Sequence, residues 1–298
     1  MPSETLTFAR DLSVIIPVYN EAGIISATLE KIFEALSNCS LSWEVIVVDD
    51  GSNDGGVVGL LPRPQLRLVR HPVNMGNGAS VKSGIRASRA EHCVIMDGDG
   101  QHLIVDALKC VDGLSEYDLV IGARDFSNSG TKHRNLANVI YSRLASYVSD
   151  FDVQDLTSGM RAFKREKVME ILHLFPNRFS SPTTMTLGML RLGYPVKFIP
   201  IHVQSRTGTS KIRIFQDGVR FLMIILKIST LFSPMKIFLP VSALMFSVGA
   251  LTYLHFLFWE HRFSLWSVVL LTNAITIFMI GLVAEEISQL KLKGSSQT

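Results

Sequence analysis

The two side chains whose spacing most suggests chemistry are Asp97 and Asp99, which flank a single glycine directly after a short apolar run. Asp and Gly at the end of a strand often form only a turn. Two carboxylates in this position also offer hard oxygen ligands for Mg²⁺ or Mn²⁺, and they leave other coordination positions for diphosphate oxygens. A cation held there would stabilise the charge that develops on a phosphate leaving group.

Two further polar segments follow apolar, β-branched runs. Residues 17–21 are Pro-Val-Tyr-Asn-Glu, and residues 49–55 are Asp-Asp-Gly-Ser-Asn-Asp-Gly. Ligands of parallel sheets bind at the carboxyl ends of the strands, so we expect these segments and residues 97–102 to converge on one edge. A turn explains any one of the three, but the three together favour a ligand site.

The elements that must position these segments alternate along residues 1 to about 205. Short β-branched runs predict strands at residues 13–17, 44–48, 66–69, 93–96 and 119–121. Helical patterns lie between most of them and include residues 21–36, 79–88 and 135–148. This order predicts an α/β fold with a mostly parallel sheet.

The composition indicates that part of the chain leaves water. Of the 298 residues, 47% are hydrophobic and only 18% are charged, and the mean hydropathy is +0.28. The formal charge of +3 is too balanced for a nucleic-acid partner. Three cysteines without C-x-x-C spacing indicate neither a disulfide framework nor a zinc site.

Two apolar stretches without Asp, Glu, Lys or Arg, at residues 237–259 and 263–283, account for this composition. Each reaches the roughly 20 residues that a helix needs to cross about 30 Å of hydrocarbon. A pair of buried core helices is the alternative. Residues 260–262 separate the stretches and predict a tight helical hairpin. Lysines lie before and after the pair, which places both of its ends in the cytoplasm by the positive-inside tendency.

Residues 211–232 mix a broad apolar face with basic side chains, which is typical of a helix in the lipid headgroup region. A helix packed on the soluble domain is the alternative.

The first residues of the chain lack a basic segment followed by an apolar core, so no secretory signal is expected and the first domain should stay in the cytoplasm.

Six segments carry a family resemblance, and they occur in the order VIIPVYNE, VVDDGSNDG, NMGNGASVKSGI, MDGDGQH, DLTSGMRAFKR and SRTGTSK. This order resembles the family 2 glycosyltransferases with a GT-A, Rossmann-like fold, specifically the polyprenyl-phosphate glycosyltransferases of the dolichol-phosphate mannose synthase type. The resemblance covers about residues 12 to 215. The paired C-terminal spans resemble the bacterial and archaeal branch of that group.

The resemblance implies a donor site and a metal site. Side chains that match nucleotide-contacting positions are Pro17, Tyr19, Glu21, Asp50 and Asp97. Strand-end packing is the alternative for the proline and the tyrosine. Side chains that match the Mg²⁺ or Mn²⁺ ligands are Asp97, Asp99 and Gln101. The glycine-rich segment at residues 74–78 lacks the spacing of a nicotinamide site, but as a helix N-terminus it could face a diphosphate.

On the acceptor side, Arg124 and Arg134 match arginines that grip a lipid phosphate, for which the guanidinium fork is suited. Asn138 stands where some relatives have Ser. Arg206, Ser210 and Lys211 match a loop that closes over the diphosphate and the lipid phosphate, and a solvated charged face is the alternative reading of that loop.

Asp155 opens the DLTSGMR segment, which lines the sugar and acceptor side of the cleft in the family. It could be a base, a contact to a sugar hydroxyl or an orienter of Arg161. A lipid phosphate is already ionised near neutral pH, so positioning and charge neutralisation should dominate catalysis. We therefore predict that Asp155 orients the reactants and that no residue is an obligatory general base. The expected catalytic set is Asp155, Arg124, Arg134 and Arg206.

The resulting interpretation is a membrane-anchored inverting glycosyltransferase that moves one sugar from a nucleotide-diphosphate sugar to undecaprenyl or dolichyl phosphate. A UDP-sugar is slightly favoured over GDP-mannose. The expected division is a cytoplasmic catalytic domain at 1–210, a juxtamembrane helix at 211–234 and a transmembrane hairpin with a cytoplasmic tail at 235–298. The hairpin can also be a contact surface for a homo-oligomer.

Three alternatives stay open at this point. A family 2 enzyme with a glycolipid or polysaccharide acceptor would need a base, and it would usually carry a Q-x-x-R-W segment, which the sequence lacks. A non-catalytic membrane scaffold would need neither the two aspartates nor the arginines. A Rossmann oxidoreductase is disfavoured by the missing glycine fingerprint.

Overall fold

The computed structural model describes residues 10–57, 59–60, 62–124, 132–178, 181–202, 230 and 233–293. Of Arg10 and of residues 132–138, 140–141 and 291–293 only the backbone is described. The described residues fall into two units. One lies within Met1–Tyr147 and Phe151–Lys211, and the other lies within Val148–Asp150 and Ile212–Thr298.

The first unit is built on one seven-stranded sheet with the order β3-β2-β1-β4-β6-β5-β7. Its strands are β1 (Arg10–Val18), β2 (Trp43–Asp49), β3 (Leu66–Arg70), β4 (Ala90–Ile95), β5 (Leu119–Arg124), β6 (Arg161–Lys164) and β7 (Val196–Ile201). β6 runs antiparallel to β4 and β5, and the other pairs are parallel. The predicted α/β class and the mostly parallel sheet are confirmed.

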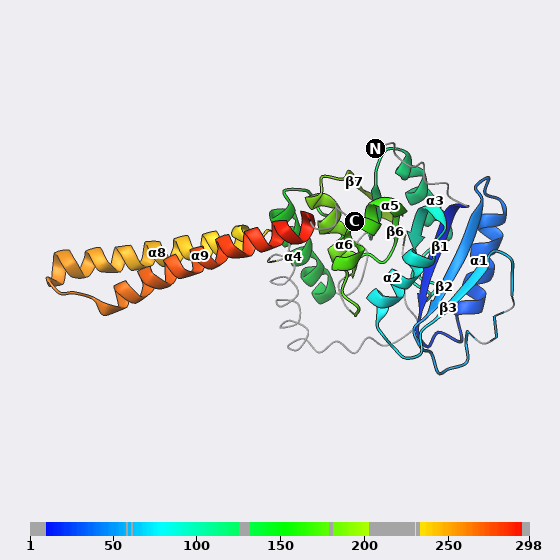
Figure 1. Ribbon diagram of the computed structural model, residues 1–298, viewed down its shortest axis with the longest axis horizontal. Helices are drawn as coiled ribbons and strands as arrows, with labels where there is room; N and C mark the ends of the chain where they lie inside the picture. Colours follow the sequence, from blue (N-terminus) through cyan, green and yellow to red (C-terminus); the bar gives the residue numbers. More distant parts are fainter. Residues whose placement is uncertain are drawn as a thin grey trace. The chain divides into compact units, whose positions relative to one another are not determined.

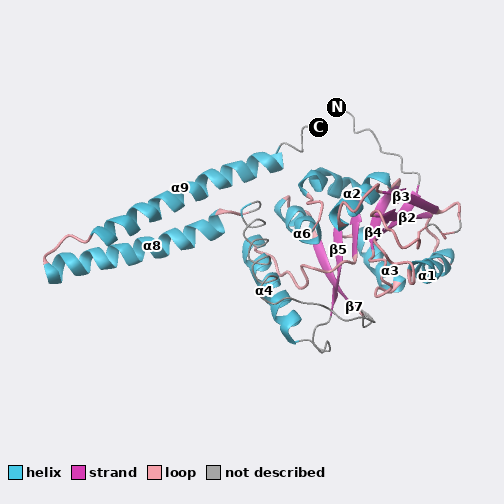
Figure 2. Ribbon diagram, turned by 90° about the horizontal axis from the view of Figure 1, so that it is seen from below, coloured by secondary structure: helices cyan, strands magenta, loops and turns pink. Residues whose placement is uncertain are grey.

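Helices cover both faces of the sheet, with α1 and α3 on one side and α2 and α6 on the other (Figures 1 and 2). The helices of this unit are α1 (Ile25–Ser37), α2 (Asn77–Ala87), α3 (Ile104–Asp112), α4 (Lys132–Ser149), α5 (Arg165–Ile171) and α6 (Ser181–Arg191). Alternate residues of β1 supply the two cores. Val14 and Ile16 pack in the core with α1 and α3, whereas Ile15 packs in the core with α2, α5 and α6.

All five predicted strands are present, and β6 and β7 are two further strands that were not predicted. β6 is the short segment Arg-Ala-Phe-Lys, which has no β-branched residue and no clear alternation. Its place between β4 and β5 comes from non-local pairing, with Arg161 opposite both Ile95 and Ile121. Because β6 is antiparallel, the loop that leads into it lies at the carboxyl edge of its neighbours.

The second unit contains a helical hairpin of α8 (Met235–His255) and α9 (Leu265–Lys293), with a π-helical turn at Phe256–Glu260. Its two candidate membrane spans are Met235–Glu260 and Leu265–Leu290, close to the predicted 237–259 and 263–283. Large apolar side chains point outward, and Trp266 is 81% exposed. Ser267 is fully buried and donates a hydrogen bond to Thr252 Oγ1 at 3.1 Å. The predicted juxtamembrane helix at 211–234 lies almost wholly outside the described residues.

Candidate active site

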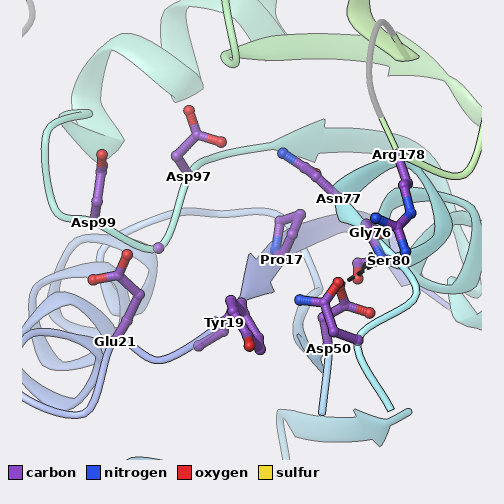
Figure 3. Close-up of a pocket in the computed structure, with 13 residues that line it drawn as sticks. Pro17, Tyr19, Glu21, Asp50, Gly76, Asn77, Ser80, Asp97, Asp99 and Arg178 are labelled. Carbon is purple, nitrogen blue, oxygen red and sulfur yellow. Dashed lines mark hydrogen bonds between the residues drawn. The ribbon is translucent and has the colours of Figure 1, made fainter. Parts of the chain in front are cut away.

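The carboxyl ends of β1, β2 and β4 surround a cavity of about 430 Å³. Because these strands are adjacent and parallel, the segments that follow them meet at one edge, as the sequence predicts. The cavity is lined by Pro17, Val18, Tyr19, Glu21, Asp50, Asn74, Gly76, Asn77, Ser80, Asp97, Gly98, Asp99 and Arg178 (Figure 3). All the predicted donor-side residues are therefore together, and of the three predicted metal ligands only Gln101 is not among the lining residues.

The charge of this pocket is its most informative property. Four carboxylates line it, whereas a single guanidinium does so among the described residues. A diphosphate is itself an anion, so a compensating cation would favour its binding among these carboxylates. The lining residues thus fit a site that takes a divalent cation and a diphosphate together.

Asp97 and Asp99 lie on the turn after β4. Burial raises the pKa of Asp97 above its usual value and Asp99 adds to this rise, whereas electrostatic interactions with His102 and Arg124 oppose it. The backbone N–H of Gln101 donates to Asp99 Oδ1 at 3.2 Å, which helps to fix the turn. Among the described residues, no three His, Cys, Asp or Glu side chains could hold a metal ion by themselves. Two carboxylates with substrate oxygens remain a suitable donor set for Mg²⁺ or Mn²⁺.

Gly159 is packed directly on Asp97. A Cβ at residue 159 would lie 2.2 Å from Asp97 Oδ2, which no side chain can occupy without moving the carboxylate. This contact exists because the loop before β6 lies beside the end of β4. No pattern around Gly159 in the sequence predicts this contact, since it depends on strand β6, which has no clear sequence signal.

Asp50 organises the loop before α2. Its Oδ1 accepts hydrogen bonds from Met75 N–H at 2.9 Å and from His71 Nδ1 at 2.8 Å, and its Oδ2 accepts one from Gly76 N–H at 2.8 Å. His71 is held in turn by Ser83 Oγ, 2.9 Å from Nε2. Asp50 therefore fixes the backbone of one wall of the pocket while it still lines the cavity.

Two amide groups at the start of α2 are not open to a phosphate. Ala79 N–H donates to Asn177 O at 2.7 Å, and Gly78 N–H donates to Arg178 O at 3.4 Å. The expectation that this glycine-rich helix end faces a diphosphate is wrong for these two amides, because carbonyl groups of the loop before α6 take the place that an anion would need.

Arg124 and Asp155 form a bidentate ion pair on the other side of the same edge. Arg124 Nε lies 2.8 Å from Asp155 Oδ2, and Nη2 lies 3.0 Å from Oδ1. The same Nη2 donates to Thr157 Oγ1 at 2.6 Å, and the backbone N–H of Arg124 donates to Asp155 Oδ2 at 3.2 Å. Burial alone would raise the pKa of Asp155, but the hydrogen bonds and the charge of Arg124 outweigh it and hold the pKa below its usual value.

Arg161 is fully buried. The hypothesis that Asp155 orients Arg161 is not supported, because the hydrogen bonds of Arg161 go to other groups. Its Nε donates to Ser158 O at 2.9 Å, its Nη2 donates to Leu156 O at 2.9 Å, and its Nη1 donates to Thr186 Oγ1 at 2.5 Å. Burial lowers its pKa to about 9. Arg161 therefore shapes the loop before β6 through carbonyl groups, and in this structure Asp155 orients Arg124 instead.

The remaining predicted acceptor-side residues are not tested by these contacts. Arg134 and Asn138 lie one turn apart on the backbone of α4, and their side chains are outside the described residues. Arg206, Ser210 and Lys211 also lie outside the described residues.

Comparison with known proteins places the chain in a family. Residues 13–172 match the family described as Glycosyl transferase family 2, and residues 233–290 match the GtrB C-terminal hairpin. The chain belongs to glycosyltransferase family 2, in agreement with the resemblance found in its sequence.

Several relatives have names that include a polyprenyl phosphate. A dolichyl-phosphate beta-glucosyltransferase of Trichomonas vaginalis is 28% identical over 59% of this chain and 56% of its own length, so the match spans little more than half of that relative. The dolichyl-phosphate beta-glucosyltransferase of Dictyostelium discoideum is 25% identical over 73% of each chain. The dodecaprenyl-phosphate galacturonate synthase of Rhizobium johnstonii is 27% identical over 55% of this chain and 52% of its own length.

Solved structures show the same architecture. Glucosyl-3-phosphoglycerate synthase from Mycobacterium tuberculosis, in a complex with Mn²⁺, uridine diphosphate and phosphoglyceric acid, superposes with a TM-score of 0.58. The match has 18% identity and covers 74% of this chain and 79% of that one. At this identity the likeness shows the fold alone, which is GT-A-like.

Proposed function

We propose that this glycosyltransferase moves a single sugar from a nucleotide-diphosphate sugar to a polyprenyl phosphate such as undecaprenyl or dolichyl phosphate. The observation that carries the proposal is the pocket in which four carboxylates converge on the carboxyl edge of the sheet, next to the Arg124–Asp155 pair. A UDP-sugar is the favoured donor over GDP-mannose. Relatives named for lipid-phosphate sugar transfer support the proposed acceptor. A structural neighbour solved with uridine diphosphate supports the proposed donor.

In this proposal Asp97 and Asp99, with Gln101, hold Mg²⁺ or Mn²⁺ together with the diphosphate of the donor. The bound cation would stabilise the negative charge that develops on the departing nucleoside diphosphate. Pro17, Tyr19, Glu21 and Asp50 hold the nucleoside. Neighbouring structures solved with Mn²⁺ or with Mg²⁺ and uridine diphosphate support this arrangement.

The acceptor side supplies its positive charge from the protein. Arg124, held by Asp155, and Arg134 bind the acceptor phosphate, and Asn138, Arg206, Ser210 and Lys211 complete its surroundings. An acceptor oxygen forms the new bond to the anomeric carbon while the bond from that carbon to the donor phosphate oxygen breaks, and the configuration inverts. The acceptor oxygen is already ionised, because the second pKa of a phosphate monoester is about 6, so no side chain has to remove a proton.

The proposed division keeps a catalytic domain at residues 1–210, a juxtamembrane helix at 211–234 and a membrane hairpin at 235–298. In this proposal the catalytic domain and both ends of the hairpin lie on the cytoplasmic side, as the positive-inside tendency of the flanking lysines favours. The outward-facing apolar side chains of α8 and α9 support the anchor.

The proposal is tested by incubating the detergent-solubilised full chain with radiolabelled UDP- and GDP-sugars, undecaprenyl or dolichyl phosphate, and Mg²⁺ or Mn²⁺. We expect one donor to give a chloroform-soluble labelled product that disappears without the cation and in an Asp99→Ala variant. Metal-dependent nucleotide binding without any lipid product would contradict the proposed acceptor and favour a glycolipid or polysaccharide acceptor.

A further inference from the structure

Arg178 lies in the pocket on the side away from the two metal-site aspartates. Figure 3 shows it beside Gly76 and Ser80, near Asp50, whereas Asp97 and Asp99 lie on the opposite side. The contacts agree with this view. A Cβ at Gly76 would lie 2.8 Å from both Cα and Cγ of Arg178, and the N–H of the same glycine donates to Asp50 Oδ2. Arg178 and Asp50 therefore flank one backbone unit of the pocket wall.

The backbone under Arg178 is fixed to α2. Lys82 Nζ donates to Phe175 O at 3.1 Å and also to the side-chain oxygen of Asn177, and Ala79 N–H donates to Asn177 O at 2.7 Å. Arg178 is an exposed residue, and in the described part of the chain no group accepts a hydrogen bond from its guanidinium. Backbone that is fixed to α2 thus places the guanidinium of Arg178 at the cavity, where its N–H groups can bind a ligand.

Asp50 can take one more hydrogen bond at this place. Its Oδ1 already accepts two, but its Oδ2 accepts only the N–H of Gly76, and each carboxylate oxygen has about two acceptor positions. The far side of the pocket thus offers an acceptor on Asp50 and donors on Arg178. The diphosphate cannot satisfy them, because the proposed cation draws it to Asp97 and Asp99.

We propose that Arg178 recognises the base of the donor nucleotide by hydrogen bonding, an inference that rests on the proposed function. Its guanidinium donates to an exocyclic carbonyl oxygen of the base, and Asp50 accepts the neighbouring ring N–H. Uracil and guanine present such a carbonyl beside an N–H. Cytosine and adenine present an amino group beside an unprotonated nitrogen. The amino group would then face the N–H donors of Arg178, and the nitrogen acceptor would face the acceptor oxygen of Asp50. Arg178 is thereby a specificity-determining residue for keto bases.

The inference is tested by calorimetric titration of the full chain in detergent with Mn²⁺ and each of UDP, CDP, GDP and ADP. Each pair, UDP with CDP and GDP with ADP, exchanges a keto base for an amino base at constant diphosphate. We expect the wild type to prefer the keto member of one pair. Arg178→Ala should weaken that nucleotide by about tenfold, as expected for one charge-assisted hydrogen bond at a partly exposed site, and its amino partner by less than about twofold.

Two further variants make the result specific. Arg89→Ala removes an exposed arginine beside the start of β4, at the other end of that strand from the pocket, and should change no affinity. Arg178→Gln keeps an N–H donor and should retain part of the keto preference, which a purely structural role would not predict. Unchanged melting temperatures of the variants confirm folding.

Equal weakening of both members of a pair, and of inorganic pyrophosphate, would overturn the inference, because Arg178 would then contact phosphate. An unchanged preference in Arg178→Ala would overturn it as well. The titration needs no lipid, so a failure of the proposed acceptor leaves its outcome intact. Absence of any nucleotide binding by the wild type would overturn the proposed function and this inference with it.

Discussion

The turn that carries Asp97 and the loop that carries Asp155 lie side by side at one edge of the sheet, yet the pKa values of the two carboxylates are shifted in opposite directions. Burial and a neighbouring carboxylate raise the pKa of Asp97, whereas Arg124 holds the pKa of Asp155 below its usual value. Asp155 has its positive partner within the protein at 2.8 Å. Asp97 is placed where a cation from outside would relieve the burial of its charge.

In the proposed function, this difference lets one edge of the sheet bind two anionic substrates. The donor would bring negative charge to a pocket that is already negative, so a divalent cation would bind with it. The acceptor phosphate would meet Arg124, which the buried carboxylate of Asp155 holds in a fixed orientation. Gly159 connects the two regions, because it lies in the Asp155 loop and packs on Asp97.

The largest effect is expected for Asp99→Ala, which breaks the cation side of the comparison. Sugar transfer should fall by roughly a thousandfold or more, since a divalent cation supplies several kcal/mol of stabilisation to a leaving diphosphate. Radiolabel transfer to polyprenyl phosphate measures the loss. Asp112→Ala, which removes an exposed carboxylate at the end of α3, should be neutral, and a comparable loss there would refute a specific role for Asp99.

A somewhat smaller effect is expected for Gly159→Ala, which tests the contact between the two loops. The new Cβ has to displace the Asp97 carboxylate, so Mn²⁺-dependent binding of UDP should weaken by roughly ten- to a hundredfold. Gly59→Ala is the matched control, because a Cβ there has open space. Normal UDP binding by Gly159→Ala would show that the geometry of Asp97 is not critical.

Asp155→Asn breaks the acceptor side without touching the pocket. The amide cannot hold Arg124 by two charge-assisted bonds, so we expect kcat to fall by about a hundredfold, the size expected for a misplaced catalytic group, with little change in the KM for the donor. Single-donor kinetics with saturating lipid measure this split. A rise in donor KM without a change in kcat would place Asp155 on the donor side.

The pH dependence of the same variant distinguishes an orienting residue from a base. The lowered pKa of Asp155 keeps it ionised throughout pH 6–8, so wild type and Asp155→Asn should share one profile shape there. The pair stabilises the fold above the unfolded-state pKa of about 3.9 and loses this contribution as the pH falls through the lower folded-state pKa. A pH limb between 6 and 8 that disappears in Asp155→Asn would identify a general base.

The smallest effect is expected for Arg124→Lys, which keeps the positive charge and removes the planar guanidinium fork. Lysine cannot bond both carboxylate oxygens and Thr157 in one plane, so transfer should fall by only about tenfold. Arg124→Ala should fall much further in the same assay. Equal losses in the two variants would mean that geometry, and not charge, carries the whole contribution.

Much of the donor region was predictable from sequence because its strands are strongly patterned and its ligands follow them directly. β1, β2 and β4 end in the three polar segments, and the rule for parallel sheets brings those ends together. Alternate residues of β1 pack in the two cores, one on each face of the sheet, and helices cover both of these cores.

The acceptor region was less predictable because its contacts are non-local. Asp155 reaches Arg124 across 31 positions only because β6 inserts between β4 and β5, and this short strand has no local signal. Gly159 meets Asp97 for the same reason. Arg178 enters the pocket on a loop fixed by Lys82 and Asn177, which no pattern within that loop indicates.

In the proposed function, the Asp97–Asp99 region obtains its positive charge from a bound cation and the Asp155 region obtains it from Arg124. The affinity for UDP with and without Mn²⁺ in the wild type, Asp99→Ala and Asp155→Asn tests this difference. We predict that Mn²⁺ tightens binding at least about tenfold in the wild type and in Asp155→Asn but not in Asp99→Ala. Loss of this coupling in Asp155→Asn, or its survival in Asp99→Ala, would show that the two regions do not have separate sources of positive charge.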